Sequence, residues 1–269
     1  MTERTLQAER AAEKGWAVYK VGGPALEDPG LISPLADEIR RAGRPVVLVH
    51  GGGRYIERAL KTLNLESEFV SGRRVTSPEA MEVVDMVLSG TVNKGLAAGL
   101  TAAGLPAIGL SGRDAGLIRA RLEPGLGRVG TPAEVDVRPL RALWDAGYVP
   151  VVAPVSSGPS GESVNVNADE AALGIARALG ARSLVYLSDV DGVRVGAGTA
   201  DRLTEAEAEI RIADGTIAGG MTLKVRVALE ASRAGIPEVV VAGKGRLTGG
   251  FAGTVIEAAH ASVALEVKR

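Results

Sequence analysis

The chain has 269 residues with 31 basic and 32 acidic side chains, and this net charge of −1 offers no field to attract nucleic acid or an acidic membrane surface. Cysteine is absent and histidine occurs twice, which excludes disulfides, thiolate nucleophiles and a histidine-rich metal site. The N-terminal segment is charged and no run of 18 apolar residues occurs, so we expect a cytoplasmic protein without a membrane span.

Apolar runs of strand length alternate with helical patterns along the chain. Strands are predicted at 16–23 and 45–50, and each is followed by apolar residues at helical spacing. Ser77 and Pro78 are placed as the N-cap and first residue of a long helix. Further strands are predicted at 106–110, 148–155, 183–190 and 238–243, and further helices at about 169–179 and 220–234.

This alternation is typical of a mostly parallel sheet that helices bury on both faces. Residues 113–137 interrupt it with glycines and short alternating runs, which predict hairpins beside the sheet. Glycines and polar residues cluster at the carboxyl ends of the predicted strands, where open α/β sheets bind ligands. The sequence therefore predicts an α/β fold, a three-layer α/β/α sandwich around a mostly parallel central sheet.

Two glycine-rich loops follow predicted strands, "KVGG" at 20–23 and "HGGG" at 50–53. Glycine lets the backbone approach a ligand closely, and a helix that begins there offers unpaired N–H groups to an anion. A tight strand-to-helix turn is an equally good interpretation of either loop alone. No P-loop motif occurs, and the one G-x-G-x-x-G match, at 125–130, lacks the preceding strand and following helix of a dinucleotide site.

Three further segments are candidates for a site. "NVNADEAA" at 165–172 places two amides and a carboxylate before a helix, which is also the pattern of a capped turn. "SDVDGV" at 188–193 follows a strand and could line a nucleotide or metal pocket or simply form a turn. "GGMTLKV" at 219–225 places Lys224 near a helix N-terminus, where a bound anion would compensate an unfavourable cation. A solvated surface lysine is the alternative.

The chain resembles the amino acid kinase family in six motifs that occur in family order: "KVGG", "HGGG", "GRRVT", "NVNADEAA", "LSDVDGV" and "GGMTLK". The resemblance extends from about Val18 to Thr254, and it is greatest to the members that phosphorylate N-acetyl-L-glutamate. It implies transfer of the γ-phosphoryl group of ATP, with Mg²⁺, to the side-chain carboxylate, the second step of arginine biosynthesis. No metal ligand among the side chains is implied.

The resemblance also implies an organisation of the chain. Residues 1–269 would form a single kinase domain, with an N-lobe at about 16–155 for the amino acid and for dimerisation. A C-lobe at about 160–258 would bind ATP. A homodimer is expected from the family and from the general prevalence of two-fold assemblies.

Individual residues acquire roles through the same resemblance. Lys20 and Lys224 would stabilise the transferring phosphoryl group, and Asp169 would hold both ammonium groups in place. Gly52, Gly53, Arg74 and Asn165 would bind the amino acid, with the Arg74 guanidinium on its α-carboxylate. The residues implied for ATP binding are Gly22, Gly23, Asp189, Val190, Asp191, Gly192, Val193, Arg194, Thr216, Ile217 and Ala218.

This chemistry is compatible with a chain that is poor in histidine. A glutamate carboxylate, whose ordinary pKa is about 4.3, is ionised at neutral pH and needs no general base. The obstacle is the repulsion between that carboxylate and a polyanionic triphosphate. Phosphoryl transfer is accelerated by positioning and charge neutralisation, for which lysines, glycine N–H groups and Mg²⁺ are suitable.

Two other functions are compatible with the fold. One is a kinase for a carrier-protein-linked aminoadipate or glutamate in lysine or arginine synthesis, but "RRVT" and "NVNAD" match the acetylglutamate pattern and the net charge indicates no basic docking face. The other is a non-catalytic arginine sensor or nucleotide-binding regulator. The presence of both Lys20 and Lys224 argues against it.

The C-terminal region departs from the members that arginine inhibits. Those members usually carry a hydrophobic, Glu-containing segment before a terminal "GTxI", whereas "AGKGRLTGGFAGTVIEA" at 242–258 keeps "GTVI" and is otherwise glycine-rich. They also have an N-terminal helix that links dimers into a hexamer. Residues 2–14 could form a helix with only a thin apolar face. We therefore expect a dimer rather than a hexamer, without feedback inhibition by arginine.

Overall fold

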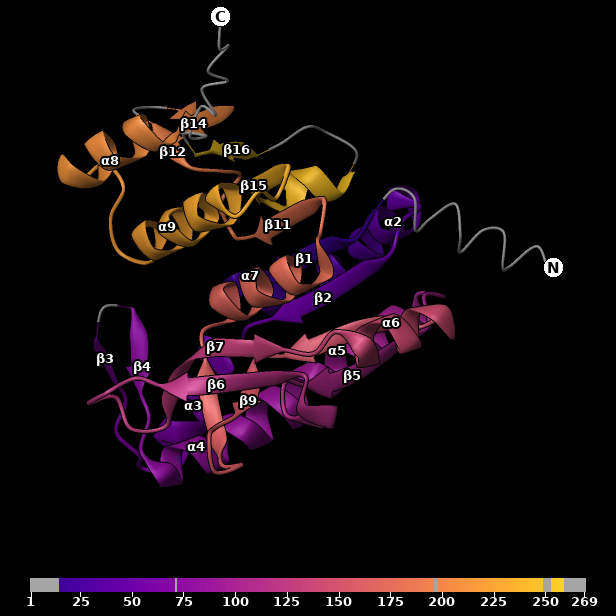
Figure 1. The fold of residues 1–269 in the computed structure, drawn as a ribbon, viewed down its shortest axis with the longest axis vertical. Helices are drawn as coiled ribbons and strands as arrows, with labels where there is room; N and C mark the ends of the chain where they lie inside the picture. Colours follow the sequence, from indigo (N-terminus) through magenta and orange to yellow (C-terminus); the bar gives the residue numbers. More distant parts are fainter. Residues whose placement is uncertain (1–14, 71, 196–197, 249–252, 259–269) are drawn as a thin grey trace, which may run out of the picture.

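A computed structural model of the chain describes residues 15–70, 72–195, 198–248 and 253–258 (Figure 1). The possible helix at 2–14 lies outside these described residues, as does part of the glycine-rich segment, at 249–252. No helix in the described ranges is long and apolar enough to cross a bilayer.

An eight-stranded sheet forms the centre of the molecule (Figure 1). Its strands are β1 (Ala17–Val21), β2 (Val46–His50), β5 (Ala107–Ser111), β8 (Val149–Ala153), β11 (Ser183–Leu187), β14 (Arg202–Thr204), β15 (Glu238–Ala242) and β16 (Thr254–Glu257). They lie in the order β14-β16-β15-β11-β1-β2-β8-β5. Every neighbouring pair is parallel except β15 with β16. The predicted α/β fold with a mostly parallel central sheet is confirmed.

Helices cover both faces of the sheet. One face packs against α2 (Ile32–Ala42) and α5 (Asn93–Ala102), and the other against α7 (Ala168–Leu179) and α9 (Gly220–Arg233). The remaining helices are α3 (Gly53–Thr62), α4 (Pro78–Asp85), α6 (Arg138–Asp145), α8 (Glu205–Ala213), a π-helical segment (Met86–Val92) and the 3₁₀ segments Gly23–Glu27, Pro29–Leu31, Asp114–Gly116 and Lys244–Thr248.

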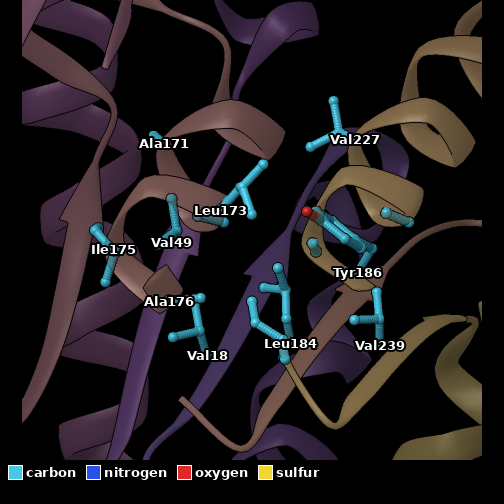
Figure 2. Close-up of a cluster of buried hydrophobic side chains, with 14 of the residues drawn as sticks. Val18, Val49, Ala171, Leu173, Ile175, Ala176, Leu184, Tyr186, Val227 and Val239 are labelled. Atoms are coloured by element: carbon cyan, nitrogen blue, oxygen red, sulfur yellow. The ribbon is translucent and has the colours of Figure 1, made fainter. Parts of the chain in front are cut away.

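Alternation along the central strand produces the two buried faces. In β1, Tyr19 and Val21 belong to the core under α2 and α5, whereas Val18 belongs to the core under α7 and α9. Figure 2 shows part of the second core, in which Leu184 and Tyr186 of β11 lie among apolar side chains of α7 and α9. Lys20 occupies the next position of β1 on that same face, because successive side chains of a strand alternate.

Four short strands lie beside the main sheet and close on themselves (Figure 1). They are β6 (Ile118–Leu122), β7 (Val129–Val135), β9 (Val155–Ser157) and β10 (Ser163–Val166). The antiparallel β6–β7 pair confirms the hairpin that the sequence predicts within 113–137. Two small hairpins that the sequence did not predict pair β3 (Glu68–Val70) with β4 (Arg73–Val75) and β12 (Arg194–Val195) with β13 (Gly198–Thr199).

The predicted long helix is interrupted by a π-helical segment. Ser77 caps it by accepting a hydrogen bond from the Ala80 N–H, and Pro78 is its first residue, as the sequence predicts. Helical structure then continues through α4, the π segment and α5 to Ala102. Single π turns inside α-helices are frequent at functional sites.

The sheet has a topological switch point at β1, where successive connections lead to strands on opposite sides. The chain passes from β1 to β2 on one side, and β11 returns to pair with β1 on the other. Ligands of open α/β sheets bind at such a switch point, outside the carboxyl ends of the strands. Lys20 lies near the carboxyl end of β1, in register with Tyr186 of β11, and thus at this crevice.

Candidate active site at the carboxyl edge of the sheet

Two lysines from different elements share one carboxylate at the switch point. The Lys20 Nζ of β1 lies 2.8 Å from Asp169 Oδ1, and the Lys224 Nζ of α9 lies 3.4 Å from Asp169 Oδ2. Asp169 stands in the first turn of α7, where a carboxylate is favoured by the helix dipole. The side chain of Asn167 caps this helix by accepting from the Asp169 N–H.

This cluster is buried. Lys20, Asp169 and Lys224 are 8%, 7% and 9% exposed. Burial alone would raise the pKa of Asp169, but the two ammonium groups lower it below its ordinary value, so the carboxylate is ionised. Burial, together with the charge of Lys20, lowers the pKa of Lys224 to about 8. One negative charge thus faces two buried cationic groups.

A ring and a glycine shape the surroundings of the two ammonium groups. The Lys224 Nζ lies 5.8 Å from the ring centroid of Tyr186, whose buried hydroxyl has no hydrogen-bond partner among the described residues. A Cβ on Gly22 would lie 2.3 Å from the Lys20 Nζ. Any side chain at position 22 would therefore displace this ammonium group.

The "HGGG" loop forms the second part of the site. Helix α3 begins at Gly53, the last residue of the loop, and so follows the glycines as the sequence predicts. A Cβ on Gly52 would lie 2.6 Å from Leu88 Cδ2, whereas a Cβ on Gly53 would have no neighbour within 4 Å. The Gly52 N–H has no hydrogen-bond partner in the described part of the chain. This donor is available to an anion.

The β3–β4 hairpin supplies two arginines with different partners. The Arg73 guanidinium forms an ion pair with Glu170 of α7. Arg74 is 7% exposed, donates to Ser67 Oγ and to the Gly53 carbonyl, and stacks 4.5 Å from the Phe69 ring centroid. No carboxylate pairs with Arg74 within the described residues. Of the two arginines, Arg74 is therefore the better anchor for an anionic ligand.

A cleft of about 440 Å³ joins these parts. Five residues that the sequence predicts for the site line it: Lys20, Gly52, Gly53, Arg74 and Asn165. The Asn165 amide donates to Thr76 Oγ1, which fixes its orientation beside the cleft. Asp169 adjoins the cleft through its ion pair with Lys20, and Lys224 pairs with the other oxygen of Asp169.

The segments predicted for ATP do not line this cleft. Residues 189–194 follow β11 after Ser188, and 216–218 lie between α8 and α9. They precede Gly219, whose φ of +59° at the start of α9 favours glycine. The side chains of Val193 and Ile217 are buried in the hydrophobic core, so only their backbone could contact a ligand. Gly22 joins β1 to the following 3₁₀ segment, which begins at Gly23.

Most of the cleft's apolar wall was not predicted from the sequence. Ile56, Phe69, Leu88, Val129 and Pro154 line it together with the predicted polar residues. These side chains come from α3, β3, the π segment, β7 and the residue between β8 and β9. Gly72 between two short runs that contain Phe69, Val70 and Val75 was a readable sign of the β3–β4 hairpin, and its φ of +79° is one that glycine adopts readily.

A family model described as the amino acid kinase family matches residues 15–243, which is most of the chain. The chain belongs to the amino acid kinase family. Relatives of this kinase chain include the acetylglutamate kinase of Rubrobacter xylanophilus, 45% identical over 89% of this chain and 96% of that protein. The acetylglutamate kinase of Chloroflexus aggregans is 46% identical over 82% of this chain and 89% of its own.

Solved structures agree with this family membership. A Streptococcus mutans protein has a TM-score of 0.81 at 26% identity and covers 91% of this kinase chain and 99% of its own. An N-acetylglutamate synthase from Neisseria gonorrhoeae, complexed with coenzyme A and N-acetyl-glutamate, has a TM-score of 0.78 at 25% identity. The match covers 95% of this chain and 62% of that synthase. A carbamate kinase from Giardia lamblia shares the fold, with a TM-score of 0.65 at 17% identity.

The depressed pKa of Lys224 makes a prediction about stability. Because the lysine pKa of the unfolded kinase is near its ordinary 10.5 and the folded value is about 8, protonation of Lys224 in the folded state opposes folding. Lys224→Met should therefore raise the free energy of unfolding at pH 7, on the order of 2 kcal/mol. The gain should shrink as the pH rises from 8 towards 10.5, and urea denaturation at pH 7 and 9.5 measures both effects.

Lys61→Met, on the exposed face of α3, is the matched control and should change stability little at either pH. A Lys224→Met variant that is less stable than the wild type at pH 7 would contradict the expectation. In that case the ion pair with Asp169 outweighs the burial of the ammonium group.

Proposed function

We propose that this chain transfers the γ-phosphoryl group of ATP to the side-chain carboxylate of N-acetyl-L-glutamate, as acetylglutamate kinases do in the second step of arginine biosynthesis. The products are N-acetyl-L-glutamyl 5-phosphate and ADP. Acetylglutamate kinases 45–46% identical to the chain over more than four-fifths of its length support this substrate. The observation that carries the reaction type is the pair of buried ammonium groups, Lys20 and Lys224, on the single carboxylate of Asp169.

The proposed chemistry depends on charge neutralisation. Lys20 and Lys224 stabilise the charge that spreads over the transferring phosphoryl oxygens, and Asp169 orients both ammonium groups by accepting from them. The Gly52 and Gly53 N–H groups add uncharged donors at the start of α3. The substrate carboxylate is itself the nucleophile, because it is ionised at neutral pH. No proton needs to be removed from it.

The amino acid occupies the cleft between the glycine loop and the β3–β4 hairpin. Arg74 pairs with the α-carboxylate, a role for which its burial and the absence of a carboxylate partner in the described residues prepare it. Burial lowers the pKa of Arg74, which reflects the loss of water that a bound carboxylate would compensate. Asn165 completes the site through its oriented amide. The apolar wall accepts the uncharged part of the substrate.

ATP binds across Gly22, Gly23, residues 189–194 and residues 216–218, and it enters as its magnesium complex. The described residues contain no group of three or more His, Asp or Glu side chains that could hold a metal ion. Mg²⁺ retains several waters and is commonly held by substrate phosphates. Mg²⁺ bound to the phosphates of ATP would enter as part of the substrate and would add to the neutralisation of the phosphate charge.

The wider organisation follows the same proposal. The N-lobe, about 16–155, binds the amino acid and forms the homodimer interface, and the C-lobe, about 160–258, binds ATP. Two-fold homodimers are the commonest soluble assemblies. The near-neutral charge gives no reason to expect a nucleic acid partner, and a biosynthetic kinase that consumes ATP acts in the cytoplasm.

Hydroxylamine trapping of the acyl phosphate tests the substrate. With ATP and Mg²⁺ present, the purified chain should form hydroxamate strongly with N-acetyl-L-glutamate and weakly or not at all with free glutamate or N-acetyl-aminoadipate. Buffer without an amino acid is the blank. Retained ATP binding with no hydroxamate from any small substrate would overturn this proposal and favour a carrier-linked kinase or a silent regulator.

Removal of either ammonium group should affect turnover more than folding. Lys20→Ala and Lys224→Ala should each lower kcat by about 10²–10³, the effect of losing one transition-state donor. Melting temperatures should show that both variants fold. Lys61→Ala serves as the control for loss of a surface charge, and its kcat should equal that of the wild type. Near-normal turnover in both variants would remove these lysines from the mechanism.

Arg74 should instead act on substrate affinity. Arg74→Lys keeps a positive charge but loses the bidentate fork, so the KM for N-acetyl-L-glutamate should rise by roughly 10-fold with a smaller change in kcat. The KM for ATP should stay near the wild-type value. Arg58→Lys, on exposed α3, is the matched control. An unchanged KM for the amino acid would show that Arg74 does not bind its carboxylate.

A further inference from the structure

A buried polar network lies behind the glycine loop, on the face of the sheet opposite Lys20. Along β2, Val47 and Val49 belong to the core under α7, whereas Leu48 belongs to the core under α2 and α5. By alternation His50 faces α5, where it meets Asn93, the first residue of that helix. His50 and Asn93 are both completely buried.

The backbone fixes the orientation of the Asn93 amide. Its Nδ2 lies 2.9 Å from the Val151 carbonyl and 3.2 Å from the Leu110 carbonyl, and its Oδ1 lies 3.2 Å from the Lys94 Nζ. Only an NH₂ group can donate to two carbonyls. The same Nδ2 lies 3.1 Å from His50 Nε2. An amide nitrogen cannot accept a hydrogen bond, so Nε2 carries no proton and shares the two amide hydrogens with the carbonyls.

The tautomer of His50 follows from its neighbour. A neutral imidazole that accepts at Nε2 carries its proton on Nδ1, which lies 2.8 Å from the Gly51 carbonyl and donates to it. Burial lowers the pKa of His50 to about 4, and the nearby Lys94 charge acts in the same direction. The ring is therefore neutral at neutral pH and holds the Gly51 carbonyl on the α5 side.

Holding this carbonyl also directs the next N–H group. The carbonyl of Gly51 and the N–H of Gly52 belong to one planar trans peptide, in which they point in opposite directions. With the carbonyl turned towards His50, the Gly52 N–H turns to the opposite side, where Lys20 and Gly52 line the cleft. A flip of this peptide would exchange a donor for an acceptor in front of an anion.

We propose that His50 is a positioning residue of this site, which fixes the 51–52 peptide so that the Gly52 N–H faces the transferring phosphoryl group. The inference rests on the proposed function, because it assigns His50 a role in that reaction. His50 acts through the backbone and touches no substrate. Asn93 completes the arrangement by fixing which ring nitrogen donates.

Two packing features make room for this network. A Cβ on Gly109 of β5 would lie 2.0 Å from Asn93 Oδ1, so the strand has no side chain where the amide enters. The π segment ends directly before Asn93 and carries Leu88, against which Gly52 packs. The helix irregularity, the network and the glycine loop are thus in direct contact with one another.

Three substitutions at His50 separate the two ring nitrogens. His50→Asn places an amide nitrogen near the Nδ1 position and can still donate to the Gly51 carbonyl. His50→Gln reaches instead towards the Nε2 position, and His50→Leu makes neither bond. Asn93 keeps both backbone carbonyls as acceptors in all three variants, so we expect each to fold.

His50→Leu and His50→Gln should lower kcat by about 10- to 100-fold, with little change in either KM. This fall in kcat is no larger than the fall expected when a transition-state donor is removed entirely. His50→Asn should restore most of kcat. Equal kcat in all three variants, or a wild-type kcat in His50→Leu, would overturn the proposal. Melting temperatures accompany each assay, because a purely structural role would lower them without this order of activities.

The tautomer can be measured without any variant of the network. The chain has only two histidines, so His260→Gln leaves a single imidazole for ¹⁵N NMR. We expect a protonated Nδ1 and an unprotonated Nε2, and the opposite assignment would overturn the inference even if a His50 variant failed to fold.

If the wild-type chain forms no acyl phosphate, the proposed function fails, whereas this spectrum still decides whether His50 holds the Gly51 carbonyl.

Discussion

The site depends on a single carboxylate that is shared by two buried ammonium groups. Asp169 compensates one positive charge, so the cluster with Lys20 and Lys224 keeps an excess of positive charge in a region that water scarcely reaches. Removing a cation from water is costly, and a single anion does not compensate two. Without a ligand, the cluster therefore has an excess positive charge that a bound polyanion would neutralise. Burial is the main cause of the lowered pKa of Lys224, and the charge of Lys20 acts in the same direction.

The parallel sheet is what allows such a cluster to exist. Lys20 occupies a position on β1 that, by alternation, would otherwise hold another apolar side chain like Val18. Its ammonium group lies beyond the apolar core because the strand ends at Val21 and because Gly22 has no side chain to occupy the same space. The helix dipole of α7 adds to the field that keeps Asp169 ionised. Local stability is given up here for a strong and fixed electrostatic field.

Elements that local rules determine were readable from the sequence. Alternating burial identified the long strands, and Ser77 with Pro78 identified the start of α4. Helix α8 was missed although Thr204 and Glu207 form a capping box. The closing of four short strands beside the sheet was not readable, because it pairs Asn165 with Val129 across a long stretch of chain. Such pairings are decided by tertiary packing and leave no local pattern.

The same distinction applies to the site. Its charged residues stand in motifs with recognisable order, so the resemblance alone could nominate Lys20, Asp169 and Lys224. The apolar wall has no such signal: Leu88 contacts Gly52 because of a π segment that no sequence rule indicated. Hydrophobic residues of helices are ordinarily core residues, and only their position in space reveals which of them border a ligand.

The two sides of the glycine loop meet opposite demands. On one side, buried ammonium groups supply charge that attracts a phosphate. On the other, the Gly51 carbonyl is held by His50, which decides where the Gly52 N–H points. A neutral imidazole donates to the Gly51 carbonyl without adding charge, and Asn93 ensures that it donates from the correct nitrogen.

Donors that are oriented before the substrate arrives need no reorganisation during the reaction, which is the main source of electrostatic catalysis. The neutrality of His50 is therefore as much a part of the site as the charge of Lys20.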